Sequence, residues 1–212
     1  KYFPGVKALD NICFKAYGGE VLAFLGENGA GKSTLLKVLN GDYQPTKGEY
    51  LLDGVQKHFS SPHEAIQEGI SVIYQERQIL LELSVAENIY LGRMPSKKFG
   101  IIDKAKANQM AQKIIDDFGL PISPTTKVKD LSIAYQQMVE IMKAYSRENL
   151  KVICFDEPTA SLSDAEIDSL FEIIAKLKAQ GKIIIYVSHR MKEIQQIADK
   201  VAIFKDGHYV DT

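Results

Sequence analysis

The chain has little cysteine and almost no excess charge. Its two cysteines among 212 residues exclude a disulfide framework, so we expect a reduced, cytosolic compartment. The 26 basic residues nearly balance the 27 acidic ones and leave a formal net charge of −1. This near-neutrality excludes a global basic field of the kind that holds nucleic acid or an anionic membrane surface.

Long apolar runs are also missing. No stretch approaches the ~20 apolar residues that cross a bilayer, and no signal peptide is visible. We therefore expect any membrane role to be carried by a partner. The chain starts at Lys1 rather than at methionine, so we expect it to be a piece of something longer. Its 45% hydrophobic and 25% charged residues suit a globular domain with a sizeable core.

Three short apolar runs have the pattern of strands buried on both faces, at residues 21–25, 152–155 and 183–187. An amphipathic helix is predicted between the last two, since its apolar residues recur at helical spacing. These residues are Ile167, Leu170, Phe171, Ile174 and Leu177. Ser163 and Glu166 predict a capping box at its start, and Gly181 predicts its end. A strand, a helix and a further strand form a βαβ unit, which indicates a mostly parallel sheet.

A glycine-rich loop follows the first of these strands. Residues 26–33 read Gly-Glu-Asn-Gly-Ala-Gly-Lys-Ser, the spacing of a phosphate-binding P-loop. Glycines let the backbone N–H groups point inward around phosphate oxygens, and a helix predicted over 33–40 adds its positive end. Lys32 is predicted to neutralise the β- and γ-phosphates, and the Ser33 hydroxyl to bind Mg²⁺. The predicted ATP-binding residues here are Gly26, Asn28, Gly29, Ala30, Gly31, Lys32, Ser33 and Thr34.

Two carboxylates follow the second strand. Asp156 would lie at the carboxyl end of a central strand, where it can hold Mg²⁺. Glu157 comes next and projects the other way, so we interpret it as the general base that polarises the attacking water. The alternative is an acidic turn at a strand end without a catalytic role, against which the P-loop upstream argues. A P-loop with these carboxylates leaves kinases, GTPases and motor ATPases open.

The remaining segments complete the predicted fold. Residues 10–16 and 49–52 look like short strands of an antiparallel edge, whereas residues 82–147 show helical patterns and no convincing buried strand. We predict an α/β P-loop NTPase with a mostly parallel central sheet, an antiparallel β edge and an inserted helical subdomain. The single domain would span 1–212, with an ATP-binding core at 1–81 and 148–212 and the helical subdomain at 82–147.

Several segments, in order along the whole chain, resemble the ABC ATPase family. Residues 156–162, Asp-Glu-Pro-Thr-Ala-Ser-Leu, resemble its Walker B end and D-loop, and residues 72–76 resemble its Q-loop. The resemblance implies that Gln75 reaches Mg²⁺ and the attacking water. Residues 186–190 resemble the switch segment, which implies that His189 contacts the γ-phosphate and acts in catalysis with Glu157 and Gln75. Residues 131–132 stand where the family signature falls, which implies that Ser132 binds ATP held by a partner domain.

The N-terminal aromatic residues enter through the same resemblance. Phe3 resembles the aromatic residue that stacks on adenine in the family, and a ring on a base face contributes ~1–3 kcal/mol in other stacking systems. Two alternatives stay open, namely that Phe3 packs on the sheet or that Tyr2 takes the role. The metal-binding residues that the motifs and the resemblance imply together are Ser33, Gln75 and Asp156.

Within the family, the chain resembles the ATPases of monosaccharide importers for arabinose, ribose, galactose or xylose. The segments responsible are residues 3–9, 26–31, 86–92, 138–141 and 188–191. Such proteins usually carry two of these domains in tandem, and the intact Gly-Lys-Ser and Asp-Glu motifs suggest the first. The implied partners are membrane permease subunits, a second nucleotide-binding domain and, indirectly, a sugar-binding protein. The implied location is the cytoplasmic face of the membrane.

The chain departs from the family pattern at two places. Residues 131–135 read Leu-Ser-Ile-Ala-Tyr where the signature is usually Leu-Ser-Gly-Gly-Gln. Ala134 adds a methyl group where the backbone approaches phosphate, so one shared site is expected to be weakened. Ser163 stands where the family often has aspartate in the D-loop, and helix capping offers a structural reason.

The function expected from these observations is ATP binding and hydrolysis, with Mg²⁺, to power sugar import through a permease. One alternative is an ABC ATPase that acts on nucleic acid or ribosomes, against which the near-zero net charge argues. Another is a nucleotide-binding regulatory domain with weak turnover. No nucleic-acid partner is expected.

Overall fold

The computed structural model describes residues 1–212, which divide into two compact units. Unit 1 comprises residues 1–75, 149–158 and 174–212, and unit 2 comprises residues 76–148 and 159–173. No helix has the length and apolar character required to cross a membrane. The limits predicted for the helical subdomain, 82–147, stay a prediction.

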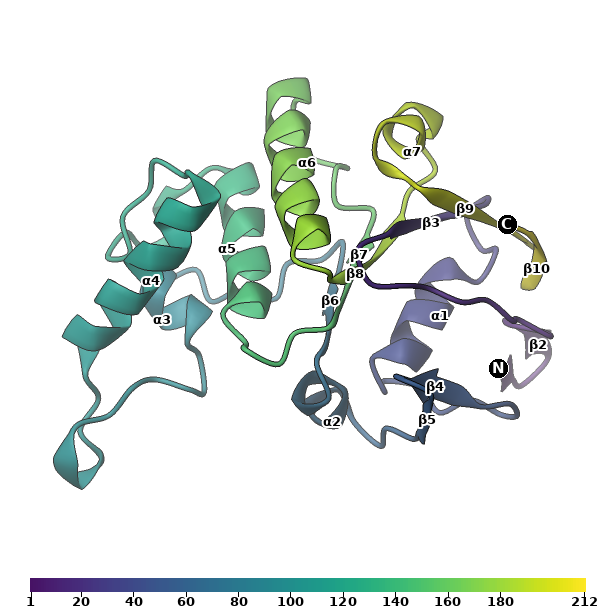
Figure 1. Cartoon of the computed structure of the whole chain (residues 1–212), viewed down its shortest axis with the longest axis horizontal. Helices are drawn as coiled ribbons and strands as arrows, with labels where there is room; N and C mark the ends of the chain where they lie inside the picture. Colours follow the sequence, from purple (N-terminus) through teal and green to yellow (C-terminus); the bar gives the residue numbers. More distant parts are fainter. The chain divides into compact units, whose positions relative to one another are not determined.

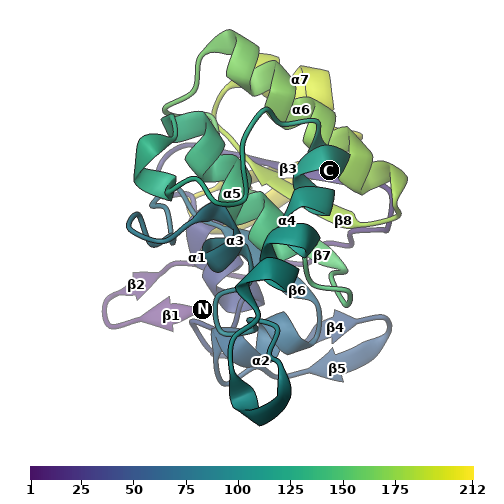
Figure 2. The same cartoon turned by 90° about the vertical axis from the view of Figure 1, so that its left-hand side faces the viewer.

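Unit 1 is built on a six-stranded sheet in the order β10-β9-β3-β8-β7-β6. Five strands run parallel, and only β10 is antiparallel to its neighbour, β9. The strands are β3 (Val21–Leu25), β6 (Ile70–Ile73), β7 (Val152–Asp156), β8 (Ile183–Val187), β9 (Lys200–Lys205) and β10 (His208–Asp211). Figures 1 and 2 show α1 (Lys32–Leu39) and α7 (Met191–Ile197) on opposite faces of this sheet. The predicted mostly parallel sheet is confirmed.

The strand register brings the carboxyl ends of the central strands to one edge. Phe24 of β3 pairs with Val187 of β8, and Asp156 of β7 pairs with the same Val187. The three central strands are almost wholly buried, in agreement with their continuous apolar runs. The segments that follow β3, β7 and β8 therefore emerge together at this edge, where open α/β sheets bind their ligands.

One face of the sheet is packed against α1. Leu35, Leu36 and Leu39 of this helix join a buried apolar cluster that includes Leu22 and Phe24 of β3. Phe24 also contacts Phe204 of β9, with ring centroids 4.9 Å apart. This packing fixes the start of α1 directly after β3, and hence the position of the glycine-rich loop between them.

Two small antiparallel sheets accompany the main sheet. They are β1 (Tyr2–Phe3) with β2 (Val6–Lys7) and β4 (Tyr50–Leu52) with β5 (Val55–Lys57). The strand predicted at 49–52 is confirmed as β4. The strand predicted at 10–16 is wrong, because only Asp10 forms a bridge, with His208. Its side chains do alternate, and Ile12, Phe14 and Ala16 pack on the core, but the backbone of 11–16 pairs with no strand.

The helices of unit 2 begin at residues that satisfy their free N–H groups. The elements wholly in unit 2 are α3 (Val85–Ile89), α4 (Lys104–Phe118) and α5 (Ile133–Tyr145), with short 3₁₀ turns at η1 (Lys98–Gly100) and η2 (Val128–Asp130). A capping box of Ser84 and Glu87 starts α3, and Asp103 caps α4. Helix α3 packs on both α4 and α5. No strand lies in unit 2, as expected for residues 82–147.

A longer helix, α6 (Asp164–Ala179), starts in unit 2 and ends in unit 1. The predicted pair of Ser163 and Glu166 meets at its start, although only half of a capping box forms. The Ser163 N–H donates to the Glu166 carboxylate at 2.9 Å, and the Ser163 hydroxyl donates to the same oxygen at 2.8 Å. The helix ends shortly before Gly181, whose φ of 77° suits only glycine well.

A short connection, α2 (Pro62–Gln67), precedes β6 in unit 1. Ser61 caps it by accepting a hydrogen bond from the Glu64 N–H, and Pro62 occupies the first turn, where no N–H is needed. The chain then enters β6, whose carboxyl end leads into the segment with Gln75.

Candidate functional site

The glycine-rich loop connects β3 to α1, as the motif predicts. Lys32 is buried, and its Nζ donates to the carbonyl oxygens of Gly26 at 2.7 Å and Glu27 at 3.0 Å. Burial lowers the Lys32 pKa, while the nearby charges of Glu157 and Asp156 oppose that shift. The ammonium group thus lies across the loop, where an incoming anion can replace the two carbonyl contacts.

Most backbone N–H groups of this loop have no acceptor in the chain. Within residues 28–34, only the Ala30 N–H donates to another backbone group, the Glu27 carbonyl at 3.1 Å. The N–H groups of Lys32, Ser33 and Thr34 form the first turn of α1 and carry its positive end. Free donors around a buried lysine are the chemistry that a polyphosphate requires, so the loop fits the phosphates of ATP.

Three glycines of the loop serve different physical needs. A Cβ on Gly26 would lie 2.4 Å from the Phe204 carbonyl oxygen, and one on Gly31 would lie 2.5 Å from that of Ala8. Gly31 also has a φ of 97°. Gly29 has a φ of 85°, yet nothing lies within 4 Å of its Cβ position. Backbone packing therefore demands glycine at 26 and 31, whereas only backbone conformation demands it at 29.

Two predicted magnesium ligands meet at the edge of the sheet. The Ser33 hydroxyl donates to Asp156 Oδ1 at 3.1 Å. Ligand oxygens in octahedral Mg²⁺ sites lie 2.0–2.1 Å from the ion and hence about 2.9 Å apart, so this pair fits two adjacent positions. Burial raises the Asp156 pKa, and the Ser33 hydrogen bond counteracts it. No cluster of three His, Cys, Asp or Glu side chains is present, so water and phosphate would supply the remaining ligands.

The predicted base lies against the predicted switch residue. His189 Nδ1 and Glu157 Oε1 are 3.1 Å apart, and the Glu157 side chain is 19% exposed against 55% for His189. Glu157 has a φ of 49°, in the left-handed region, and its N–H donates to the Val187 carbonyl at 3.0 Å. A strained backbone conformation persists where surrounding contacts hold it in place. Here the hydrogen bond to Val187 of β8 holds the backbone of Glu157. The arrangement places a carboxylate and an imidazole side by side just beyond the ends of β7 and β8.

A buried glutamate behind His189 was missed from the sequence. Glu193 of α7 accepts hydrogen bonds at 3.0 Å from the hydroxyls of Tyr186 and Ser188. Its other oxygen accepts from the Arg190 guanidinium at 3.2 Å. The network fixes the turn from β8 into α7 that carries His189. A lone glutamate in a helix gives no sequence signal of this role.

The other predicted site residues are placed as follows. The Phe3 ring meets Tyr43 edge-on, with centroids 5.3 Å apart, and Lys1 Nζ lies 5.0 Å from the Phe3 centroid. Gln75 is exposed and follows β6 by two residues. Ser132 lies in unit 2, where it caps α5 by accepting a hydrogen bond from the Tyr135 N–H at 3.4 Å. Within unit 1, the structure thus brings Ser33 to Asp156 and Glu157 to His189, while Phe3 and Gln75 form no hydrogen bond with these four residues.

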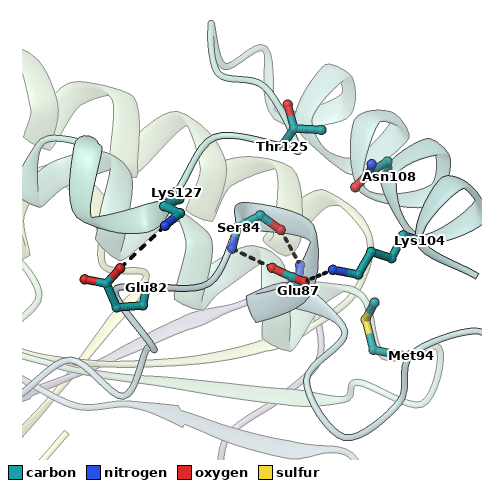
Figure 3. Close-up of a pocket in the computed structure, with 8 residues that line it drawn as sticks. All are labelled: Glu82, Ser84, Glu87, Met94, Lys104, Asn108, Thr125 and Lys127. Atoms are coloured by element: carbon teal, nitrogen blue, oxygen red, sulfur yellow. Dashed lines mark hydrogen bonds and ion pairs between the residues drawn. The ribbon is translucent and has the colours of Figure 1, made fainter. Parts of the chain in front are cut away.

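A separate hollow of about 250 Å³ lies in unit 2 (Figure 3). None of the predicted ATP-site residues lines it. Its charges are compensated, since Lys104 pairs with Glu87 at 2.9 Å and Lys127 with Glu82 at 3.6 Å. The first ion pair joins α4 to α3, and the second joins the segment after α4 to the segment before α3, so both connect elements of unit 2.

Comparison with solved structures places the fold among ATP-binding cassettes. A nucleotide-free ATP-binding cassette from an ABC transporter is similar with a TM-score of 0.87 and 28% identity, over 100% of this chain and 87% of that one. The ADP conformation of MJ1267, an ATP-binding cassette of an ABC transporter, is similar with a TM-score of 0.85 and 28% identity, over 99% and 86%.

Curated relatives are more similar in sequence. The arabinose import ATP-binding protein AraG of Mannheimia succiniciproducens is 52% identical over all 212 residues, and AraG of Escherichia coli (strain 536) is 51% identical. The chain spans 42% of the length of each of these relatives. A model of the ABC transporter family matches residues 9–160. Together with the P-loop between β3 and α1, this match shows that the chain belongs to the ABC transporter family.

Proposed function

We propose that this chain binds and hydrolyses MgATP to drive import of a sugar through a membrane permease. The observation that carries the proposal is the edge of the sheet, where a loop of free N–H groups lies next to two pairs of side chains. These pairs are Ser33 with Asp156 and Glu157 with His189. Hydrolysis of a phosphoanhydride needs a phosphate cradle, a metal site and a base, and one edge offers all three.

Each side chain is assigned one role. Lys32 and the loop N–H groups bind the β- and γ-phosphates, and Phe3 or its neighbour Tyr2 contacts the adenine. Mg²⁺, held by Ser33, Asp156 and Gln75, would neutralise charge between the phosphates. Glu157 accepts the proton of the attacking water, and His189 donates a hydrogen bond to the γ-phosphate. The 3.1 Å contact between Glu157 and His189 supports their acting at one point.

The partners follow from the family and from the relatives. We assign the chain to the cytoplasmic face of the membrane, with permease subunits and a second nucleotide-binding domain whose ATP contacts Ser132. A sugar-binding protein would deliver the substrate. Arabinose is the first sugar to test, because both relatives are named for arabinose import. Uptake of labelled arabinose by cells that lack this protein, with and without the wild-type gene, checks this choice.

Two substitutions separate binding from hydrolysis. Glu157→Gln should keep ATP affinity and lower turnover by about 10²- to 10⁴-fold, since it removes only the base. Lys32→Ala should weaken ATP binding itself by about 10- to 100-fold, because it removes a charge-assisted contact to phosphate. Binding of a fluorescent ATP analogue and release of phosphate measure the two effects.

The exposed Glu172→Gln on α6 is the matched control and should change neither quantity. Near-normal phosphate release by Glu157→Gln would reject the base assignment. Undiminished affinity of Lys32→Ala would reject the phosphate site.

A further inference from the structure

Two side chains of helix α5 form hydrogen bonds with the backbone N–H and the backbone carbonyl of Gln78, which precedes the helix in the chain. The Gln78 N–H donates to the Glu140 carboxylate, and the Lys143 ammonium donates to the Gln78 carbonyl at 3.4 Å. Glu140 and Lys143 are three positions apart on α5 and so project from the same side of the helix. All three residues belong to unit 2.

A second contact fixes the chain two residues later. Asn88 of α3 accepts from the Leu80 N–H at 2.8 Å and donates to the Leu80 carbonyl at 2.9 Å. Asn88 is fully buried, and α3 packs on α5. The segment 78–80 is therefore bound to the α3–α5 pair at both ends, and its backbone has little freedom to move independently of α5.

Stability alone does not explain the glutamate in this contact. Glu140 is only 5% exposed, and its Oε2 is buried without any hydrogen-bond partner. A buried carboxyl group with an unsatisfied oxygen is unfavourable, and an apolar side chain of similar volume is often as stable or more so. What the carboxylate supplies, and an apolar residue does not, is an acceptor for the Gln78 N–H.

These hydrogen bonds to Gln78 (the grip) lie close in sequence to two residues that the proposed function places at ATP. Gln75 precedes Gln78 by three residues, and Ser132 caps the N-terminus of the helix that carries Glu140. We propose that Glu140 is a positioning residue, which anchors the Gln75 segment to the helix of Ser132 so that the two respond to ATP together. The predicted effect of Glu140 on hydrolysis rests on the proposed function. The grip, as a set of hydrogen bonds to Gln78, does not depend on that function.

Three substitutions at position 140 test the grip. Glu140→Met keeps the volume and removes the acceptor, Glu140→Ala removes both, and Glu140→Gln keeps an acceptor oxygen. Hydrogen–deuterium exchange of the Gln78 amide should rise by about 10- to 100-fold in the Met and Ala variants and stay near the wild-type rate in Gln. Glu148→Ala, an exposed acid just after α5, is the control and should change nothing.

Kinetics separate positioning from a merely structural role. The Met variant should remain folded, keep its KM for ATP and lose about 10- to 100-fold in kcat, because Gln75 is no longer held in place. The Gln variant should restore kcat. Unchanged Gln78 exchange in the Met and Ala variants would overturn the grip, and faster exchange with unchanged kcat would overturn the positioning role. A wild-type chain that binds no ATP would instead overturn the proposed function, while the exchange rates would still decide whether the grip exists.

Discussion

At the residue scale, the glycines of the phosphate loop differ in what they tolerate. Gly31→Ala adds a Cβ 2.5 Å from the Ala8 carbonyl at a φ of 97°, whereas Gly29→Ala meets only the strain of its φ of 85°. Left-handed backbone costs an alanine roughly 1–2 kcal/mol, and overpacking adds about 1–3 kcal/mol. We expect Gly31→Ala to lose about 2–5 kcal/mol of unfolding free energy and Gly29→Ala about 1–2 kcal/mol. Urea unfolding measures both, and equal losses would contradict the packing argument.

Residue positions were easier to predict than residue contacts. The P-loop glycines, Lys32 and Asp156 have a local signature, because their spacing is set by one loop or one strand end. The contact between Glu157 and His189 joins residues far apart in sequence, and it depends on the pairing of β7 with β8. Glu193 and Glu140 act through backbone and hydroxyl groups of other segments, so no spacing in the sequence points to them.

At the element scale, helix α5 carries a buried carboxyl group, Glu140, whose ionised form is less favourable in the folded state than its protonated form. Burial raises the Glu140 pKa to about 7, although the Gln78 N–H, Lys143 and Arg77 counteract the shift. The positive side chains of Arg93 and Arg147 lie next, around Lys143. Since the folded pKa exceeds the ordinary value of 4.5, the protonated form favours the folded state. Its contribution to stability is complete below pH 4.5 and is lost as the pH rises through 7.

Glu140→Gln removes this titration and should flatten the stability profile. Between pH 5 and pH 8, the wild type should lose on the order of 2 kcal/mol more unfolding free energy than the variant. Urea titrations at the two pH values provide the measurement, with Glu148→Gln as the control that keeps the wild-type profile. Parallel profiles for the wild type and Glu140→Gln would show that the carboxyl group ionises normally.

Strands that are buried on both faces were easier to predict from the sequence than short or partly exposed ones. The strands β3, β7 and β8 are buried on both faces, so their apolar runs identify them. Residues 10–16 show alternating burial but lack a partner strand, and pairing is a property that no single segment encodes. Strand β6 is short and contains Ser71, so its pattern is weak, and its place beside β7 emerges only from the sheet.

At the scale of the whole molecule, the proposed function requires two copies of the nucleotide-binding domain. Ser132 is assigned to ATP on a partner domain, and the γ-phosphate is the group that ATP has and ADP lacks. Contacts that exist only with ATP shift the population towards the closed pair, and hydrolysis removes them. The chain should therefore associate with MgATP and separate with MgADP.

The Glu157→Gln variant is the form in which to observe this association, because its ATP persists. Sedimentation velocity of this variant should show a dimer with MgATP and a monomer with MgADP. Adding Ser132→Ala should weaken the dimer by about 10-fold, since one phosphate contact is lost. Adding Lys32→Ala should shift dimer formation to about 10- to 100-fold higher ATP concentrations, because it weakens ATP binding. The exposed Glu172→Gln, added to the same background, should leave the dimer unchanged. Equal association with ATP and ADP would mean that the γ-phosphate does not drive closure, and the role of Ser132 would then be confined to capping α5.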